Sequence, residues 1–194
     1  MATTNRDRIN RALDLLRDGL GPFVERELLR VSKVDPVTLA ERYLPDDRIN
    51  RGKPPSEWDA GTLLKAMWDA WQPVFRTTLG PGERSLVSEL RTTRNHAAHQ
   101  QPFSFDDTYR ALDSAERLLN AVSAPEQAGE IARAKGELLR LRHEEQSRTE
   151  RKKAAEATVS SQGSVQLPAW RDVVAPHNDV AQGVYQNAEF AADL

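Results

Sequence analysis

The segment "ELRTTRNHAAHQQPFSFDDTYRALD", from Glu89 to Asp113, carries the pattern that decides the fold and raises the question of function. Its centre, "RNHAAH", places Arg94, Asn95, His96 and His99 within six residues, although the whole chain of 194 residues has only four histidines. Histidines in the last turn of a helix interact favourably with the negative end of the helix dipole, which is one explanation for them. The other explanation is that the motif performs acid–base chemistry on a substrate.

The residues around this motif recur with the period of an α-helix. Leu90 and Ala97 lie at helical spacing, and Pro102 forces their helix to end near His99. Ser104 is a suitable N-cap for the next helix. The expected buried stripe of that helix is Phe105, Tyr109, Leu112, Ala115, Leu119 and Val122. The segment therefore predicts two helices joined by a short turn.

Much of the first 78 residues is also typical of helices, apart from a loop expected at "DDRINRGKPPSEWDAG". A first helix is predicted by apolar residues at helical spacing, namely Ile9, Leu13, Leu16 and Leu20. The stretch "GLGPF" is expected to end it, because glycine weakens a helix and Pro22 cannot continue one, and a second helix would start at Pro22. A further helix is expected from Asp59 to about Thr78, with an apolar side formed by Leu64, Met67, Trp68, Trp71 and Phe75.

The tryptophans of this last helix are interpreted as core residues rather than as a platform for base stacking, because they follow the helical period. No part of the sequence alternates apolar and polar residues as a half-buried strand does. The predicted fold class is therefore all-α, a helical bundle.

The bulk composition restricts the function. The net charge of -2 gives no general attraction to nucleic acid, so an RNA site would have to be a local basic patch. The absence of cysteine excludes a disulfide framework and thiolate metal sites. No apolar run approaches the ~20 residues that cross a bilayer, and "MATTNRDRIN" has no signal-peptide core, so a cytoplasmic protein without membrane contact is expected.

The chain changes character after Pro125. A heptad-like apolar seam continues for about two repeats at Ile131, Ala134, Leu138 and Leu141. The helix is then polar nearly all round, which is typical of a solvated arm. Two interpretations remain open, a charged connector and a short dimerising seam. The stretch "TVSSQGSVQ" has the composition of a flexible linker.

The motif has the groups that cleave a phosphodiester without a metal. His99 can take a proton from an RNA 2′-hydroxyl or give one to the leaving 5′-oxygen. Arg94 can bind the scissile phosphate with two hydrogen bonds, and Asn95 can orient the imidazole or a phosphate oxygen. Arg91, His96 and Arg110 would extend the basic patch and bind substrate. A 2′-hydroxyl nucleophile would restrict the substrate to RNA, in particular unpaired RNA.

The spacing of the motif complicates this chemistry. Arg94 and His99 are five positions apart, roughly 140° around an ideal helix, so they do not converge. They meet if Pro102 lets His99 leave the helical path, or if two subunits each contribute a motif to one site. Metal binding by His96 and His99 lacks a third ligand, so neither a metal nor another cofactor is expected.

The run from Arg94 to His99 resembles the signature of the HEPN superfamily (higher eukaryotes and prokaryotes nucleotide-binding). Together with "LRTTRNHAAHQQPFSFDDTYRALDSAERLLNAVSA" it is most similar to the Swt1-like HEPN subgroup, whose pattern is an R-N-x-x-A-H core followed by phenylalanine and D-D-T/A-Y-R-A-L-D. The resemblance covers residues 6–124 and is strongest over 90–122.

This resemblance implies a small helical bundle that usually dimerises and brings two motifs into one cleft. It also implies metal-independent endoribonuclease activity in many members, often in toxins and phage defence, whereas other members are binding modules. Nucleotide transfer or nucleotide binding, which some helical relatives perform, is a further possibility in the enzyme class.

The tail "LPAWRDVVAPHNDVAQGVYQNAEFAADL" is similar to the opening of a large uncharacterised ATPase family found in bacterial defence-like gene clusters. We therefore expect a HEPN bundle over 1–124, a charged helical arm over 125–158, a linker over 159–167 and the start of an ATPase portion over 168–194. The expected function is cleavage of single-stranded RNA by a homodimer. The alternative is a non-catalytic module that dimerises or docks a partner for a larger defence ATPase.

Overall fold

The computed structural model describes residues 3–31, 38 and 52–162, with side chains described as far as Ala154. These residues form α-helices α1 (Asn5–Val31), α3 (Ala60–Asp69), α4 (Pro81–Ala98), α5 (Phe105–Ala121) and α6 (Pro125–Gln162), with short 3₁₀ helices η1 (Pro55–Glu57) and η2 (Phe75–Thr77). No strand occurs among them. The predicted all-α class is confirmed.

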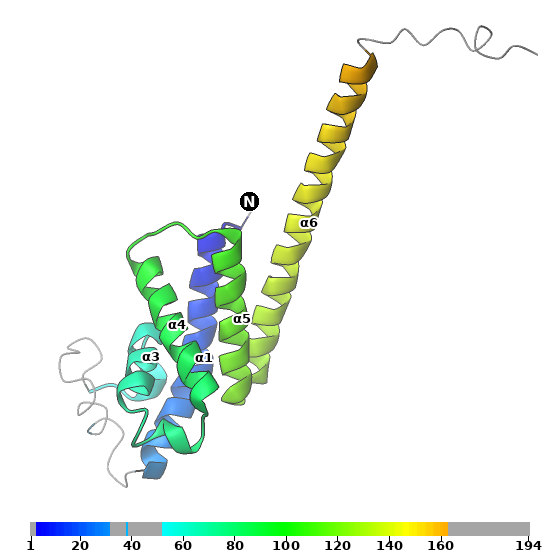
Figure 1. Cartoon of the computed structure of the whole chain (residues 1–194). Coiled ribbons are helices and arrows are strands. Elements are labelled where there is room, and N and C mark those ends of the chain that lie inside the picture. The colour runs from blue at the N-terminus through cyan, green and yellow to red at the C-terminus, as the bar shows by residue number, and fades with distance from the viewer. Residues whose placement is uncertain (1–2, 32–37, 39–51, 163–194) are drawn as a thin grey trace, which may run out of the picture. The chain divides into compact units, whose positions relative to one another are not determined.

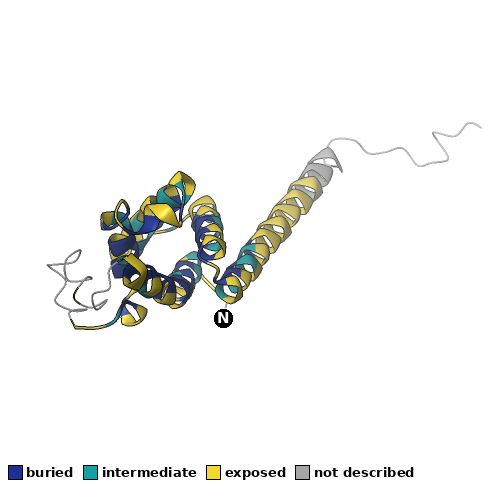
Figure 2. Cartoon of the chain, turned by 90° about the horizontal axis from the view of Figure 1, so that it is seen from below, coloured by how far each residue is buried: buried dark blue, intermediate teal, exposed yellow. Residues whose placement is uncertain are grey.

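Helices α1, α4 and α5 lie side by side, and α3 packs against α1 and α4 (Figure 1). Their buried faces turn toward one another and their exposed faces turn outward (Figure 2). The largest fully buried side chains include Leu16 and Leu20 of α1, Leu64 of α3, Leu90 of α4 and Leu118 of α5. One apolar core therefore joins helices that are far apart in the sequence, and it fixes α4 between α3 and α5.

The prediction that "GLGPF" ends the first helix is wrong, because α1 runs unbroken from Asn5 to Val31 with Pro22 inside it. Pro22 is exposed, so the backbone hydrogen bond that it removes lies on the solvent side of the helix. Gly19 and Gly21 are buried and allow close packing. A Cβ at Gly19 would collide with Cδ2 of Leu119 and lie 3.0 Å from Cβ of Ala124.

The helix expected from Asp59 to Thr78 is shorter than predicted. Helix α3 ends at Asp69 and is followed by a turn and by η2. Pro73 lacks the N–H that would donate to the carbonyl of Asp69, so the helix cannot continue through it. Trp71 and Phe75 are nevertheless buried, which explains why the apolar spacing persists beyond the helix.

The two helices around the motif are confirmed. Helix α4 ends at Ala98, and Oγ of Ser104 accepts a hydrogen bond from the backbone N–H of Asp107 at 3.1 Å at the start of α5. The expected α5 stripe is buried at Leu112, Ala115, Leu119 and Val122, and partly buried at Phe105 and Tyr109. Sequence spacing was sufficient here because caps and proline mark both helix ends.

Helix α6 contributes to the core in its first part. Ile131 and Leu138 are buried, whereas Leu141 is 48% exposed. Most of the apolar seam therefore packs against the core of the same chain. Nζ of Lys135 binds Asp113 at 2.8 Å and Glu116 at 2.6 Å on α5. The first compact unit of the chain runs from Met1 to His143 and includes this part of α6.

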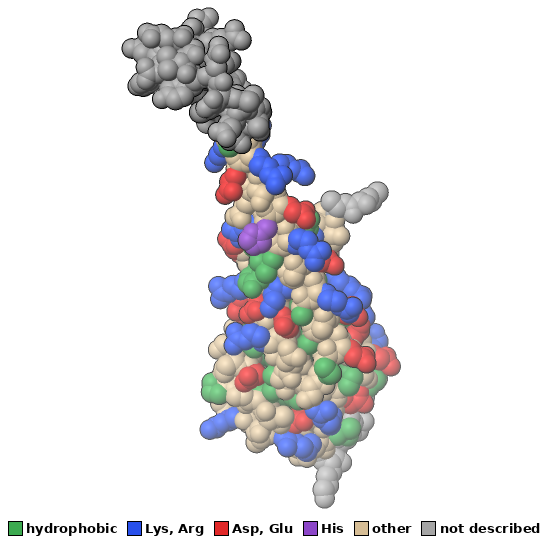
Figure 3. Space-filling view, turned by 90° about the vertical axis from the view of Figure 1, so that its right-hand side faces the viewer, with side chains coloured by type: hydrophobic (Ala, Val, Ile, Leu, Met, Phe, Trp, Pro, Cys, Tyr) green, Lys and Arg blue, Asp and Glu red, His purple; other side chains and the backbone are tan. Residues whose placement is uncertain are grey.

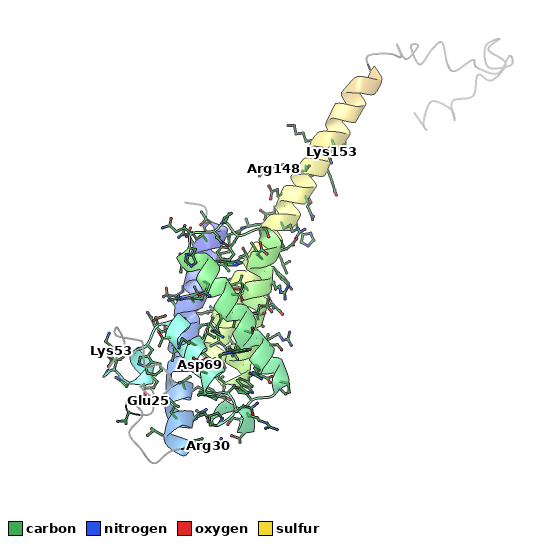
Figure 4. All side chains as sticks on the ribbon, turned by 60° about the vertical axis from the view of Figure 1, so that its left-hand side comes forward. Glu25, Arg30, Lys53, Asp69, Arg148 and Lys153 are labelled. Carbon is green, nitrogen blue, oxygen red and sulfur yellow. The ribbon has the colours of Figure 1, made fainter. Side chains whose placement is uncertain are left out.

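The second unit, residues 144–194, is described only in its helical part. All described side chains from Glu144 to Ala154 are exposed, and Arg148 and Lys153 extend from the helix in Figure 4. Basic and acidic side chains are interspersed on the face shown in Figure 3. The expected linker at 159–167 is helical to Gln162, and residues 163–194, including the tail, lie outside the described residues. None of the described helices has the length and apolar character of a membrane span.

The close approach at Gly19 predicts that Gly19→Ala lowers the free energy of unfolding by about 1–3 kcal/mol, because the added methyl overpacks the contact with α5. Denaturant unfolding followed by circular dichroism measures the change. The matched control is Gly129→Ala in α6, where a Cβ meets no atom within 4 Å. This control should be neutral or stabilising by up to about 1 kcal/mol. Equal effects of the two substitutions would contradict the packing described for α1.

Candidate functional site

Arg94 lies on α4 with its guanidinium against the first turn of α3. Its Nη2 is 3.6 Å from Oδ1 of Asp59, and its side chain is 41% exposed. A Cβ at Gly61 would lie 2.6 Å from Cζ of Arg94 and would collide with its Nε. Glycine at position 61 therefore leaves the space in which the guanidinium rests.

Asp59 is the N-cap of α3 and lies within ion-pair distance of Arg94 on α4. Its Oδ1 accepts hydrogen bonds from the backbone N–H groups of Gly61 at 2.8 Å and Thr62 at 3.2 Å, and its Oδ2 accepts one from Oγ1 of Thr62 at 2.8 Å. Burial acts to raise the pKa of Asp59, but the hydrogen bonds from Thr62 and Gly61 and the charge of Arg94 outweigh it, so this pKa is lowered. The carboxylate is therefore ionised near neutral pH and fixes Arg94 by charge as well as by shape.

A pocket of about 180 Å³ opens beside this contact. It is lined by Gly61, Thr62, Lys65, Arg91, Arg94 and Asn95. Lys65 is also 3.0 Å from the carboxylate of Asp69. Three cationic side chains from two helices thus surround one small pocket, which has the size and charge to hold a phosphate group. We call it the Arg94 pocket.

His99 does not line the Arg94 pocket. It is the C-cap of α4, and its backbone N–H still donates to the carbonyl of Asn95 at 3.0 Å, as in a regular helix. The chain leaves the helical path one residue later, at Gln100, whose φ is 58°. Of the two alternatives for joining Arg94 and His99, release of His99 from the helix by Pro102 is therefore not the geometry of this chain.

The reason is a compact turn at the end of α4. Gln100 N–H donates to the carbonyl of Ala97 at 3.1 Å, and Gln101 N–H donates to that of His96 at 3.0 Å. These two bonds form a Schellman motif, which satisfies the last carbonyls of the helix before the chain reaches proline. Arg94 and His99 accordingly keep their helical separation of roughly 140° within one chain.

The remaining predicted substrate-binding residues line two different hollows of the surface. Arg91 lines the Arg94 pocket, whereas His96 and Arg110 line a wider groove of about 860 Å³ along α4 and α5. Arg110 is ion-paired with Glu89, whose hydrogen bond and charge raise the pKa of Arg110. The predicted basic patch is therefore divided between the pocket and the groove. Its α5 member, Arg110, lies beside the acidic side chain of Glu89.

The structure adds a residue that the sequence interpretation assigned to the core. Trp71 is buried, but Trp68 is only partly buried and carries two guanidinium groups over its ring. Cζ of Arg84 is 4.6 Å and Cζ of Arg91 is 5.3 Å from the ring centroid. The seven-residue spacing of these arginines, which places them on one face of α4, was the sequence signal for this cluster.

Within the described ranges, no group of three or more His, Asp or Glu side chains is placed to hold a metal ion. The arrangement offers instead a phosphate-sized basic pocket with an amide beside it, and an exposed imidazole at the end of the same helix. These groups can bind an anionic ester and transfer protons to and from it.

Comparison with known proteins identifies one related family. The model of the Swt1-like HEPN family matches residues 11–123, which include most of α1 and all of α3, α4 and α5. No curated protein and no solved structure matches the chain.

Proposed function

We propose that this chain, which belongs to the Swt1-like HEPN family, is a metal-independent endoribonuclease that cleaves single-stranded RNA at a site shared by two copies. Members of this superfamily are commonly ribonucleases. The observation that carries the proposal is the fixed position of Arg94 at a pocket of three cations, since such a pocket suits the scissile phosphate.

The proposed reaction is an internal transfer at phosphorus. The 2′-oxygen of the nucleotide before the scissile bond attacks the phosphorus while the bond to the 5′-oxygen breaks. His99 takes the proton from the 2′-hydroxyl, and the protonated imidazole then gives a proton to the leaving 5′-oxygen. Arg94 offsets the charge on the phosphate oxygens, and Asn95 orients the phosphate or the imidazole. The products are a 2′,3′-cyclic phosphate and a free 5′-hydroxyl.

A second copy of the chain supplies the missing imidazole in this scheme. Arg94 and Asn95 line one pocket, whereas His99 of the same chain lies further around α4. In a two-fold dimer that brings the C-terminal ends of the two α4 helices together, the partner's His99 reaches the Arg94 pocket. The dimer therefore completes two equivalent sites.

The second candidate function is a non-catalytic module that docks a partner, such as an ATPase portion of the parent protein in phage defence. Leu139 and Leu141 of α6 are large apolar side chains with exposed fractions of 37% and 48%. Their exposure favours contact with a partner at this part of α6. In that case Arg94 would serve only to join α4 to α3 through Asp59.

The first prediction concerns His99. Wild-type protein should cleave unstructured RNA in the presence of EDTA and leave 2′,3′-cyclic phosphate ends, and His99→Ala should lower the rate by about 100-fold or more through loss of general acid–base catalysis. Gel analysis of end-labelled RNA measures both. The matched control is His143→Ala, which removes an exposed histidine of α6 and should leave the rate unchanged. Equal cleavage by wild type and His99→Ala would refute the assignment, and absence of cleavage by both would favour the docking module.

The second prediction concerns Gly61. Gly61→Ala should lower cleavage by at least about 10-fold while leaving the melting temperature within a few degrees of wild type, because the methyl displaces the flexible end of Arg94 rather than backbone. Gly82→Ala on α4, where a Cβ meets nothing within 4 Å, is the control and should cleave normally. Full activity of Gly61→Ala would show that the position of Arg94 against α3 is not required.

A further inference from the structure

We propose that Trp68, Arg84 and Arg91 form a binding strip for the phosphate backbone of the RNA strand next to the Arg94 pocket. We call these three residues the Trp68 strip. The inference rests on the proposed function, because it names the substrate contacts on one side of the scissile phosphate. It assigns Trp68 as the residue that positions the two arginines.

The contacts within the strip are cation–π interactions. Both guanidinium groups lie within 5.3 Å of the centroid of the same indole ring. Arg84 and Arg91 are two helical turns apart on α4, roughly 10.5 Å along the helix axis, and Trp68 of α3 lies between them. The ring of Trp68 packs against the core and is therefore rigid. A guanidinium that lies over its face is held in place by the cation–π attraction.

The two arginines differ from the neighbouring cations in their partners. Lys65, Arg94 and Arg110 each have a carboxylate within ion-pair distance. Throughout the part of the chain that the structure describes, the Arg84 and Arg91 guanidinium groups have no ion pair, and Nε of Arg84 is buried without a hydrogen-bond partner. Their charge is thus held in place by an aromatic ring and is not neutralised by an acid.

The strip is continuous with the proposed scissile site. Arg91 lines the Arg94 pocket and also contacts Trp68. Trp68 and Arg84 line the groove along α4, whose wall also includes Ser85, Ser88 and the carboxylates of Glu89 and Asp107. Arg91 contacts Trp68 and therefore connects the Arg94 pocket to this groove, so a strand bound at Arg94 can pass over Arg91 and then Arg84.

The arrangement favours phosphate over a base as the ligand of this strip. Base stacking on tryptophan needs an open ring face, whereas Arg84 and Arg91 lie over the ring of Trp68. Guanidinium groups that are already oriented lose less freedom when they bind a phosphate in a bidentate manner. The strip should therefore bind RNA with little dependence on its sequence.

The test measures binding separately from cleavage. Every variant carries His99→Ala, so that the RNA stays intact, and affinity for a fluorescent single-stranded oligonucleotide is measured by anisotropy over a range of salt concentrations. Arg84→Gln should weaken binding several-fold and reduce the slope of log K against log salt by about 0.7, the value for one lost contact with a single strand. Arg140→Gln removes an exposed arginine of α6 and is the matched control.

Trp68→Leu tests the positioning role of the ring. It should weaken binding at least as much as Arg84→Gln although it removes no charge, and Trp68→Phe should restore part of the affinity because it keeps an aromatic face. Thermal melting of each variant establishes that it is folded. A dinucleotide is too short to reach Arg84 from the Arg94 pocket, so its affinity should not respond to Arg84→Gln.

The outcomes separate this inference from the proposed function. If Arg84→Gln and Arg140→Gln have the same salt dependence, or if the His99→Ala parent binds no RNA, the strip is refuted. If the strip variants lose affinity as expected while wild-type protein cleaves no RNA with or without EDTA, the strip stands and the proposed catalysis fails.

Discussion

The contact of Arg94 with the first turn of α3 is the interaction on which the rest of the site depends. Gly61 provides the space for the guanidinium, and Asp59 provides the opposing charge while it also caps α3. The cap lowers the pKa of Asp59, so the acid stays ionised and the arginine stays in place. The same turn of α3 contributes Thr62 and Lys65 to the Arg94 pocket, and Trp68 lies on the next turns of that helix.

The end of α4 imposes the second constraint. The Schellman bonds of Gln100 and Gln101 keep His99 on the helical path. An arginine and a histidine five positions apart on a regular helix face different directions, so the two side chains of one chain do not converge on one phosphate. Under the proposed function, this geometry makes association of two copies a requirement for catalysis and leaves an isolated chain inactive.

Much of this structure could be predicted from the sequence, because proline, capping residues and apolar period mark α4 and α5 without ambiguity. The motif itself could be read from its residues. The path of α1 could not, since Gly19 and Gly21 looked like helix breakers and are in fact sites of close packing. The apolar residues continue at helical spacing after Asp69, so the sequence pattern did not show that α3 ends there.

The site was less accessible to prediction for a related reason. Asp59, Gly61 and Trp68 come from α3 or its cap and meet α4 only through tertiary packing, so no local spacing connects them to Arg94. The seven-residue interval between Arg84 and Arg91 was visible, but its meaning depends on the ring that lies beside it. The helical spacing of apolar residues alone cannot distinguish a buried tryptophan such as Trp71 from one that holds cations at the surface.

The most direct test of a site shared by two copies is a mixing experiment. Arg94→Ala and His99→Ala proteins, each inactive alone, are unfolded together, refolded as a mixture and assayed for RNA cleavage. A dimer of one variant with the other retains one site with both Arg94 and His99, so a mixture in equal amounts should recover about a quarter of wild-type activity. A mixture that stays as inactive as its components, although size-exclusion chromatography shows that mixed dimers have formed, would contradict a site built from two chains.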